Sequence, residues 1–299
     1  MKNNQLLRVY FGPFSVLQEF DPALIHVQTQ WAVIEALYSP LVEVDNNGQA
    51  VAGWARTFDW DGSTAVFQIR EDARASDGLP VTAADAAFSL KRLLILASNT
   101  RGDLSSLLCT GHKLTKISDP CPDIAVQGNT LRLSLKRKHY FLFSMLPSMD
   151  YAIIPERAVD PQTLTIRDYG ITSGPYSVQY AEEGKISLIV NKNHWRFDQK
   201  IAENVDLIGL KDSAGQWLPR AEITTAFEQG NIDVIPTYAF ANQTRMVELA
   251  ETNSDATYDP THRVVPLAIQ SEFDTLDTRI EVKDWRHSST SICKEICRQ

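Results

Sequence analysis

"TSGPYSVQYAEEGKISLIVNKNHWRFD", residues 172–198, combines a tight turn with two strand-like segments. Proline fixes one backbone dihedral and lacks an N–H, and glycine allows conformations closed to other residues, so Gly174-Pro175 predicts a rigid turn. Tyr176–Tyr180 and Lys185–Asn191 then read as strands, and Glu183-Gly184 between them is a hairpin signal. The stretch therefore predicts a rigid turn that leads into an antiparallel β-hairpin.

Helical and strand patterns alternate along the rest of the chain. Apolar residues recur at helical spacing from Val27 to Leu37, and Pro40 ends that helix. A second helix is predicted over Ala221–Gln229, with Gly230 as its left-handed cap. Further strands are predicted at Trp54–Trp60, Thr64–Arg70, Thr130–Leu135, Tyr151–Ile154, Val205–Leu210 and Ile232–Ile235. This order lacks a strict βαβ rhythm, so it predicts an α/β fold whose mixed sheet carries an inserted β-rich portion.

A helix start is predicted at Thr82 because a capping pattern stands there. The Thr82 hydroxyl can accept a hydrogen bond from a first-turn amide, and Asp85 can reach back to the start of the helix. The helix that follows places Ala87, Leu90, Leu94 and Ala97 on one side.

Length, composition and net charge narrow the class of protein to which the chain can belong. The chain has 299 residues and 43% hydrophobic residues, which suffices for one large or two ordinary domains. Its net charge is −8, and an acidic chain without a dense basic stripe is a poor fit to a nucleic-acid-binding protein. The short basic run Lys136–His139 follows a strand pattern and reads as a solvated strand end.

The sequence contains no apolar run close to the ~20 residues that span a bilayer, so no membrane insertion is expected. Met1–Gln5 leads directly into a strand-like Leu6–Phe11, with neither the apolar core nor the cleavage site of a signal peptide. Two localisations stay open. The protein is periplasmic or at the cell surface if an export signal was removed, and otherwise it is cytoplasmic.

Cysteines and histidines give no metal-binding pattern. The six histidines are scattered, no HxxxH or CxxC spacing occurs, and no metal or other cofactor is predicted. Cys109 and Cys121 bracket a loop that contains glycine and proline, and in an exported protein they are expected to form a disulfide. Cys293 and Cys297 are spaced to share one helix face.

Motifs of catalysis are missing as well. The sequence has no GxSxG elbow, P-loop or HExxH, so no enzyme activity is predicted. The carboxylates of Glu182-Glu183 and Asp119 stand in turn-like surroundings, which favours solvated groups over an acid–base pair.

Several short motifs follow one another from about residue 20 to residue 236. They are Asp21-Pro22, Ala36–Val42, Ala52-Gly53-Trp54, Asp61-Gly62, Ala65–Arg70, Ser76–Asp85, Phe88–Arg92, Thr172–Tyr176, Asn193-His194-Trp195 and Phe227–Val234. In this order the chain resembles the family 5 extracellular solute-binding proteins, the oligopeptide- and dipeptide-binding receptors of ABC importers. It departs from the family's usual glycine at Pro40, from its small residue before Gly-Pro-Tyr at Ser173, and from its Tyr-Trp at His194.

The resemblance implies the first lobe of a type II periplasmic-binding-protein fold. Residues 1–268 would form this lobe, with 1–40 and 166–268 as its core and 41–165 as the inserted subdomain. Residues 269–299 would be a hinge and the incomplete start of a second lobe that is otherwise absent. In that family the Gly-Pro-Tyr turn leads the chain from the inserted subdomain back into the main sheet, so Tyr176 and Trp195 are expected in the core.

The resemblance also implies a function. A receptor of this kind traps a peptide or similar small solute between two lobes and presents it to an ABC transporter permease. Phe14, Ser15, Glu19 and Phe20, which surround the first strand-to-helix connection, are candidates to line the ligand cleft. The alternative is that this loop is only a connection.

Two other functions stay open. The chain is an effector-binding module of a cytoplasmic transcription regulator, or a truncated receptor without tight binding. Neither the ligand nor the presence of an export signal follows from the sequence.

Overall fold

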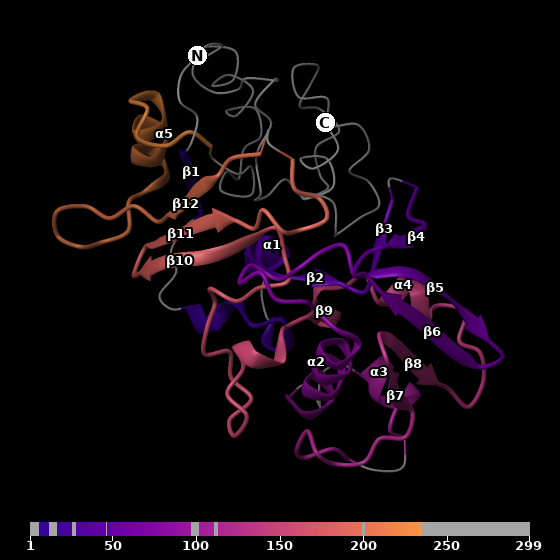
Figure 1. Ribbon diagram of the computed structural model, residues 1–299. Helices are drawn as coiled ribbons and strands as arrows, with labels where there is room; N and C mark the ends of the chain where they lie inside the picture. The colour runs from indigo at the N-terminus through magenta and orange to yellow at the C-terminus, as the bar shows by residue number, and fades with distance from the viewer. Residues whose placement is uncertain are drawn as a thin grey trace.

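The computed structural model describes residues 6–11, 17–25, 28–45, 47–96, 102–110, 113–198 and 201–234. Among these residues, two four-stranded sheets stand at opposite ends, and the short β2–β9 pair (Ser39–Pro40 and Ala152–Ile153) lies between them (Figure 1). The arrangement is an α/β fold with a mixed sheet, as predicted.

The first sheet has the order β1-β12-β11-β10, made of Leu6–Tyr10, Asn204–Ile208, Lys185–Val190 and Tyr176–Glu182. β1 and β12 are parallel, and the other neighbours are antiparallel. β10 and β11 form the hairpin predicted from the opening stretch. Gly184 in its turn has a φ of +79°, in the left-handed region that favours glycine.

The faces of this sheet follow the strand period of two. Val9 and Phe11 of the β1 segment pack in one core with Leu207, whereas Tyr10 joins a separate cluster with Ile223 on the opposite face. Helix α1 (Gln28–Leu37) contributes to the first core, and α5 (Arg220–Glu228) contributes to the second cluster. The sheet is therefore covered on both faces next to β1.

The second sheet has the order β5-β6-β8-β7, all antiparallel, and is made of Ala55–Asp61, Thr64–Ile69, Thr130–Ser134 and Ile124–Gln127. Helices α2 (Ala83–Leu96) and α3 (Gly102–Leu107) pack on its inner face. Ala65, Phe67 and Ile69 are buried while the residues between them are not, which is the alternation of a half-buried strand.

The start of α2 has the predicted capping geometry. The Thr82 N–H donates to Asp85 Oδ2 at 2.8 Å, and the Asp85 N–H donates to Thr82 Oγ1 at 3.3 Å. Of the predicted buried side, Leu90 and Leu94 are buried and Ala87 is half-buried, while Ala97 lies outside the described residues.

The remaining elements are short. They are the 3₁₀ turns η1 (Leu17–Phe20), η2 (Pro22–Leu24), η3 (Met149–Tyr151) and η4 (Glu156–Ala158), the strands β3 (Val42–Val44) and β4 (Ala50–Ala52), and the helix α4 (Leu142–Met145). The strand predicted at Ile232–Ile235 is reduced to a single parallel bridge between Val9 and Val234, and Ile235 lies outside the described residues. Gly230 has the predicted left-handed conformation, with a φ of +74°.

The turn at Ser173-Gly174 joins the two cores. The Gly174 N–H donates to the Leu37 carbonyl at 2.8 Å, and a Cβ at residue 174 would stand 2.5 Å from the Leu37 carbonyl carbon, closer than real contacts allow. Ser173 Oγ accepts from the Ser39 N–H and donates to the Ile153 carbonyl. The serine that departs from the family pattern thus ties β2 to β9.

Aromatic residues pack around this turn, with Tyr176 in the core as predicted and Trp195 at its margin. Tyr176 is buried, and its hydroxyl donates to the Ala202 carbonyl at 3.0 Å. The indole N–H of buried Trp54 donates to the Ser173 carbonyl at 3.0 Å. Trp195 is half-buried and lies edge-on to Trp54, with ring centroids 4.7 Å apart.

The described residues form two large hydrophobic cores. The division between these cores does not follow the predicted chain boundaries throughout. The first core, around α1 and the first sheet, includes Phe88 and Ile154, which belong to the predicted insertion 41–165. The second core collects the second sheet with α2 and α3. The proposed boundaries, with 1–40 and 166–268 as one unit, stay a prediction, and 269–299 lies outside the described residues.

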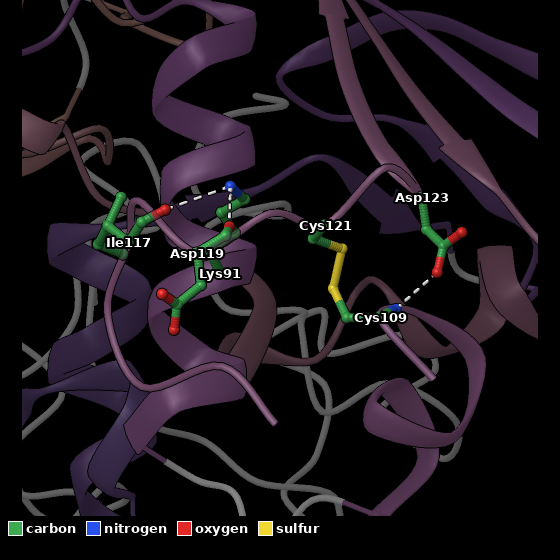
Figure 2. Close-up of a disulfide and its surroundings, with 6 residues drawn as sticks. All are labelled: Lys91, Cys109, Ile117, Asp119, Cys121 and Asp123. Atoms are coloured by element: carbon green, nitrogen blue, oxygen red, sulfur yellow. Dashed lines mark hydrogen bonds between the residues drawn. A yellow bond between two sulfur atoms is a disulfide. The ribbon is translucent and has the colours of Figure 1, made fainter. Parts of the chain in front are cut away.

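The predicted disulfide joins Cys109 to Cys121 (Figure 2), whose Cα atoms are 5.2 Å apart. The bond closes a loop that Lys91 of α2 also holds, since its ammonium donates to the carbonyls of Ile117 and Asp119 at 3.2 Å each. Cys293 and Cys297 lie outside the described residues.

Candidate functional site

Three chain segments lie side by side and run in parallel toward one edge of the first sheet. β1 pairs with β12 in parallel register from Leu6 with Asn204 to Tyr10 with Ile208, and Val234 bridges the other side of β1, also in parallel. In open α/β sheets, ligands bind outside the carboxyl ends of parallel strands. The edge at Phe11, Ile208 and Val234 is therefore the candidate site.

Backbone hydrogen bonds extend the pairing to this edge. The Tyr10 N–H donates to the Val234 carbonyl and the Phe11 N–H donates to the Ile208 carbonyl, both at 2.9 Å. In the middle of β1, Arg8 donates from Nε and Nη2 to the two carboxylate oxygens of Asp233, each at 2.9 Å. The hydrogen bond and charge of Asp233 raise the pKa of Arg8. This ion pair holds the 233–234 segment in place beside β1.

Of the four predicted lining residues, the structure describes only Phe20 with its side chain. Phe14 and Ser15 lie outside the described residues, and of Glu19 only the backbone is described, in η1. Phe20 is 1% exposed and packs edge-on against Phe11, with ring centroids 5.8 Å apart. Phe20 therefore stands beside the candidate edge as a core residue in this arrangement, and the assignment of the four residues to a ligand cleft stays a prediction.

A buried ion pair anchors the chain directly after Phe20. Arg92 of α2 contacts both carboxylate oxygens of Asp21 and donates from Nε to the Leu164 carbonyl at 2.7 Å. Asp21 also accepts from the Ala23 N–H at 2.9 Å, which caps η2. Both side chains are almost fully buried, so each charge relies on the other. Asp21 and Arg92 stand in separate sequence motifs, and neither motif indicates that the two side chains pair.

Two buried tyrosines lie within electrostatic reach of this ion pair. Burial raises the pKa of Tyr38 and of Tyr169, and the Asp21 carboxylate adds to the rise in both. The Tyr38 hydroxyl is buried without a hydrogen-bond partner among the described atoms. Both phenols are therefore neutral, and neither serves as a proton acceptor at physiological pH.

His194 is the one described histidine that is fully enclosed. It is 4% exposed, stacks on Trp195 at a ring distance of 3.9 Å, and contacts Ser39 Oγ through Nε2 at 3.4 Å. Burial, with the positive charge of Arg70 nearby, lowers its pKa to about 3. Its Nδ1 accepts the Arg196 N–H, so the neutral ring carries its proton on Nε2 and donates toward Ser39. This serine–histidine pair is thus not arranged to abstract the serine proton.

Two further kinds of feature are absent from the part of the chain that the structure describes. Within it, no cluster of three or more His, Cys, Asp or Glu residues is arranged to hold a metal ion. No helix in these ranges has both the length and the apolar character needed to cross a bilayer.

Comparison with known proteins identifies the family. The family model described as "Bacterial extracellular solute-binding proteins, family 5 Middle" matches residues 50–279. This chain belongs to that family.

Relatives of this chain are similar to it in sequence, and solved structures are similar to it in fold. The chain is 24% identical over 208 residues to the periplasmic oligopeptide-binding protein OppA of Escherichia coli, covering 66% of this chain and 38% of OppA. It is also 24% identical over 217 residues to the nickel-binding periplasmic protein of E. coli, covering 71% of this chain and 38% of that protein. The solved structure of the E. coli murein tripeptide binding protein MppA superposes with a TM-score of 0.65 at 19% identity, over 85% of this chain and 49% of MppA. The chain spans less than half the length of each of these proteins.

Proposed function

We propose that this chain contributes the first lobe of a solute-binding receptor, which binds peptides or similar small solutes for uptake through an ABC transporter permease. Membership of the family 5 solute-binding proteins carries the proposal. The parallel edge at Phe11, Ile208 and Val234 supports it, because that edge is where an α/β sheet presents a ligand site. The action is binding and not catalysis.

A peptide is the solute class that the edge fits best. β1 and the 233–234 segment reach this end of the sheet with extended backbone, and main-chain hydrogen bonds can recognise an extended peptide without reading its sequence. OppA and MppA are named for oligopeptide and murein tripeptide binding.

The disulfide supports an exported receptor over a cytoplasmic effector-binding module. Disulfides persist in oxidising compartments such as the periplasm and the cell surface, and they are rare in the cytosol. Cys109 and Cys121 are bonded, and Cys121 is buried. The relatives are periplasmic proteins by name. We therefore place this receptor in the periplasm or at the cell surface.

The test is peptide binding by the 299-residue chain, followed by two-dimensional amide NMR. Because the chain covers less than half of its relatives' length, a peptide bound at the edge keeps much of its surface in water, and we expect a Kd of about 1 mM, on the order of −4 kcal/mol. Di- to pentapeptides should shift amide signals near Phe11, Ile208 and Val234. A nickel–histidine complex is the second ligand to be tested, because one relative is a nickel-binding periplasmic protein.

Two matched variants locate the site. Ile208 stands at the carboxyl end of β12, and Ile189 of β11 pairs with Asn204 at the opposite end of that strand. Ile208→Gln should weaken binding at least fivefold, whereas Ile189→Gln should leave it unchanged. Micromolar peptide binding would contradict the one-lobe argument. Shifts confined to residues away from this edge, or shifts with the nickel complex alone, would overturn the peptide assignment.

A further inference from the structure

The loop between β8 and α4 presents the two most exposed aromatic side chains among the described residues. Tyr140 is 81% exposed and Phe141 is 72% exposed. They follow Lys136, Arg137 and Lys138, all of which are exposed, as the predicted solvated strand end requires. Residues 136–141, KRKHYF, are called the basic–aromatic tip here.

Packed aromatic residues of β5 and α4 support the tip. The Lys138 ammonium lies 5.5 Å from the centre of the Trp60 ring and 5.7 Å from the centre of the Tyr140 ring. Trp60 in turn packs on Phe143 of α4, with ring centroids 5.2 Å apart. Cation–π contacts of this kind hold a cation over a ring without removing its charge. The tip is thus attached to the second sheet at both of its ends.

The charge of the tip contrasts with that of the chain. Lys136, Arg137 and Lys138 add three positive charges in three residues, whereas the whole chain has a net charge of −8. Asp61, at the neighbouring end of β5, is paired with Arg132 at 2.7 Å, which reduces its effect on the tip. An anionic partner is favoured at this place on an otherwise acidic protein.

Exposed aromatic rings beside lysine and arginine match the interface of an anionic membrane. Aromatic rings partition into the headgroup region, and basic side chains next to them interact with anionic lipid phosphates. A polyanion without aromatic or acyl groups contacts the charges alone, whereas a lipid headgroup region also accommodates the two exposed rings. We propose that the basic–aromatic tip is a reversible docking site for an anionic phospholipid surface.

This docking site is separate from the candidate solute site. The tip leaves the second sheet, at the other end of the described structure from the β1 and β12 edge (Figure 1). The lipid proposal therefore does not rest on the proposed solute binding. Docking at a surface also needs no membrane-spanning helix, since the tip lies on the membrane and does not cross it.

The test is co-sedimentation of the 299-residue chain with vesicles of phosphatidylglycerol and phosphatidylcholine in equal amounts, and with phosphatidylcholine vesicles alone. The chain should partition onto the anionic vesicles at low salt and much less at high salt. Tyr140→Ser/Phe141→Ser should lower the partition coefficient about tenfold. Lys136→Gln/Arg137→Gln should lower it about fivefold per cation, the fold-change that corresponds to about 1 kcal/mol each.

Matched controls stand elsewhere on the surface. Leu79→Ser/Tyr180→Ser removes two apolar side chains that are each 53% exposed, and Lys113→Gln/Lys116→Gln removes two exposed cations. Both controls should partition like the unchanged chain. Equal partition onto the two kinds of vesicle would overturn the proposal, and so would tip variants that behave like the controls.

Two other outcomes would also overturn it. If only the charge substitutions act and polyphosphate displaces the chain fully, the partner is a soluble polyanion. If Tyr140→Ser/Phe141→Ser lowers the Tm by more than a few degrees, the rings belong to the fold. Unchanged Tm with reduced vesicle binding is the expected result.

Discussion

Replacing His194 with glutamine should remove a specific part of the pH dependence of stability. The ring is enclosed by Trp54 and Trp195, and its Nε2 faces Ser39. The charged groups around it do not favour a proton, since Arg70 is a cation and Arg196 is already paired with Glu43. The folded protein therefore holds this ring in its neutral form.

The size of the effect follows from the pKa. Burial lowers the pKa of His194 from 6.5 to about 3, so the unfolded chain takes up a proton below pH 6.5 and the folded chain does not. The stability from this group is complete above pH 6.5 and is lost as the pH falls toward 3. One pH unit corresponds to about 1.4 kcal/mol, so at pH 5, about 1.5 units below the unfolded pKa, the loss is about 2 kcal/mol.

The assay is urea unfolding of the unchanged chain and of His194→Gln at pH 7.5 and pH 5.0. The variant is expected to be less stable at pH 7.5 because it loses ring packing, but its drop between the two pH values should be about 2 kcal/mol smaller. Aspartates with a lowered pKa, such as Asp77, contribute mainly below pH 4 and do not disturb the comparison. Phe67→Leu, which removes a buried ring that does not titrate, is the matched control and should keep the original drop. Equal pH dependence in His194→Gln and the unchanged chain would refute the neutral-ring argument.

Three further perturbations test the fold in the same urea assay. Gly174→Ala should cost about 3 kcal/mol, because the new Cβ meets backbone atoms that cannot move aside, and a loss below 1 kcal/mol would contradict that contact. Asp21→Asn should cost about 3–5 kcal/mol by leaving Arg92 charged and buried, and Asp21→Leu/Arg92→Met should recover most of it. Reduction should lower the stability of the unchanged chain by about 3 kcal/mol and leave Cys109→Ser/Cys121→Ser unaffected, since the loop spans a sequence separation of 12.

Local features of the fold could be predicted from the sequence because neighbouring residues determine them. The turn at Gly184 and the cap at Gly230 require a positive φ, and glycine at both places indicates it. The capping box at Thr82 and Asp85 spans three residues and needs no other part of the chain. The loop disulfide falls in the same class, since its two cysteines are close in sequence.

Features formed between distant segments could not be predicted in this way. Asp21 and Arg92 are 71 residues apart, and nothing in either motif shows that the two side chains meet in the core. The predicted Ile232–Ile235 strand was an extended segment without a known neighbour, and its partner Val9 comes from the start of the chain. Phe20 was assigned to the cleft from its place near a loop, and its burial depends on residues of the first core from several parts of the chain.

The same long-range pairing explains how the candidate site is assembled. Its central strand, β1, takes one parallel neighbour from 204–208 and the other from 233–234, so the edge is incomplete until both segments have returned. Arg8 and Asp233 are 225 residues apart and form a bidentate ion pair across that return. Closing such a contact costs loop entropy before the contact adds stability, so local contacts alone do not build the edge. The candidate site therefore depends on the long-range pairing of the first sheet, and a substitution that weakens the Arg8–Asp233 ion pair acts on the site without touching its residues.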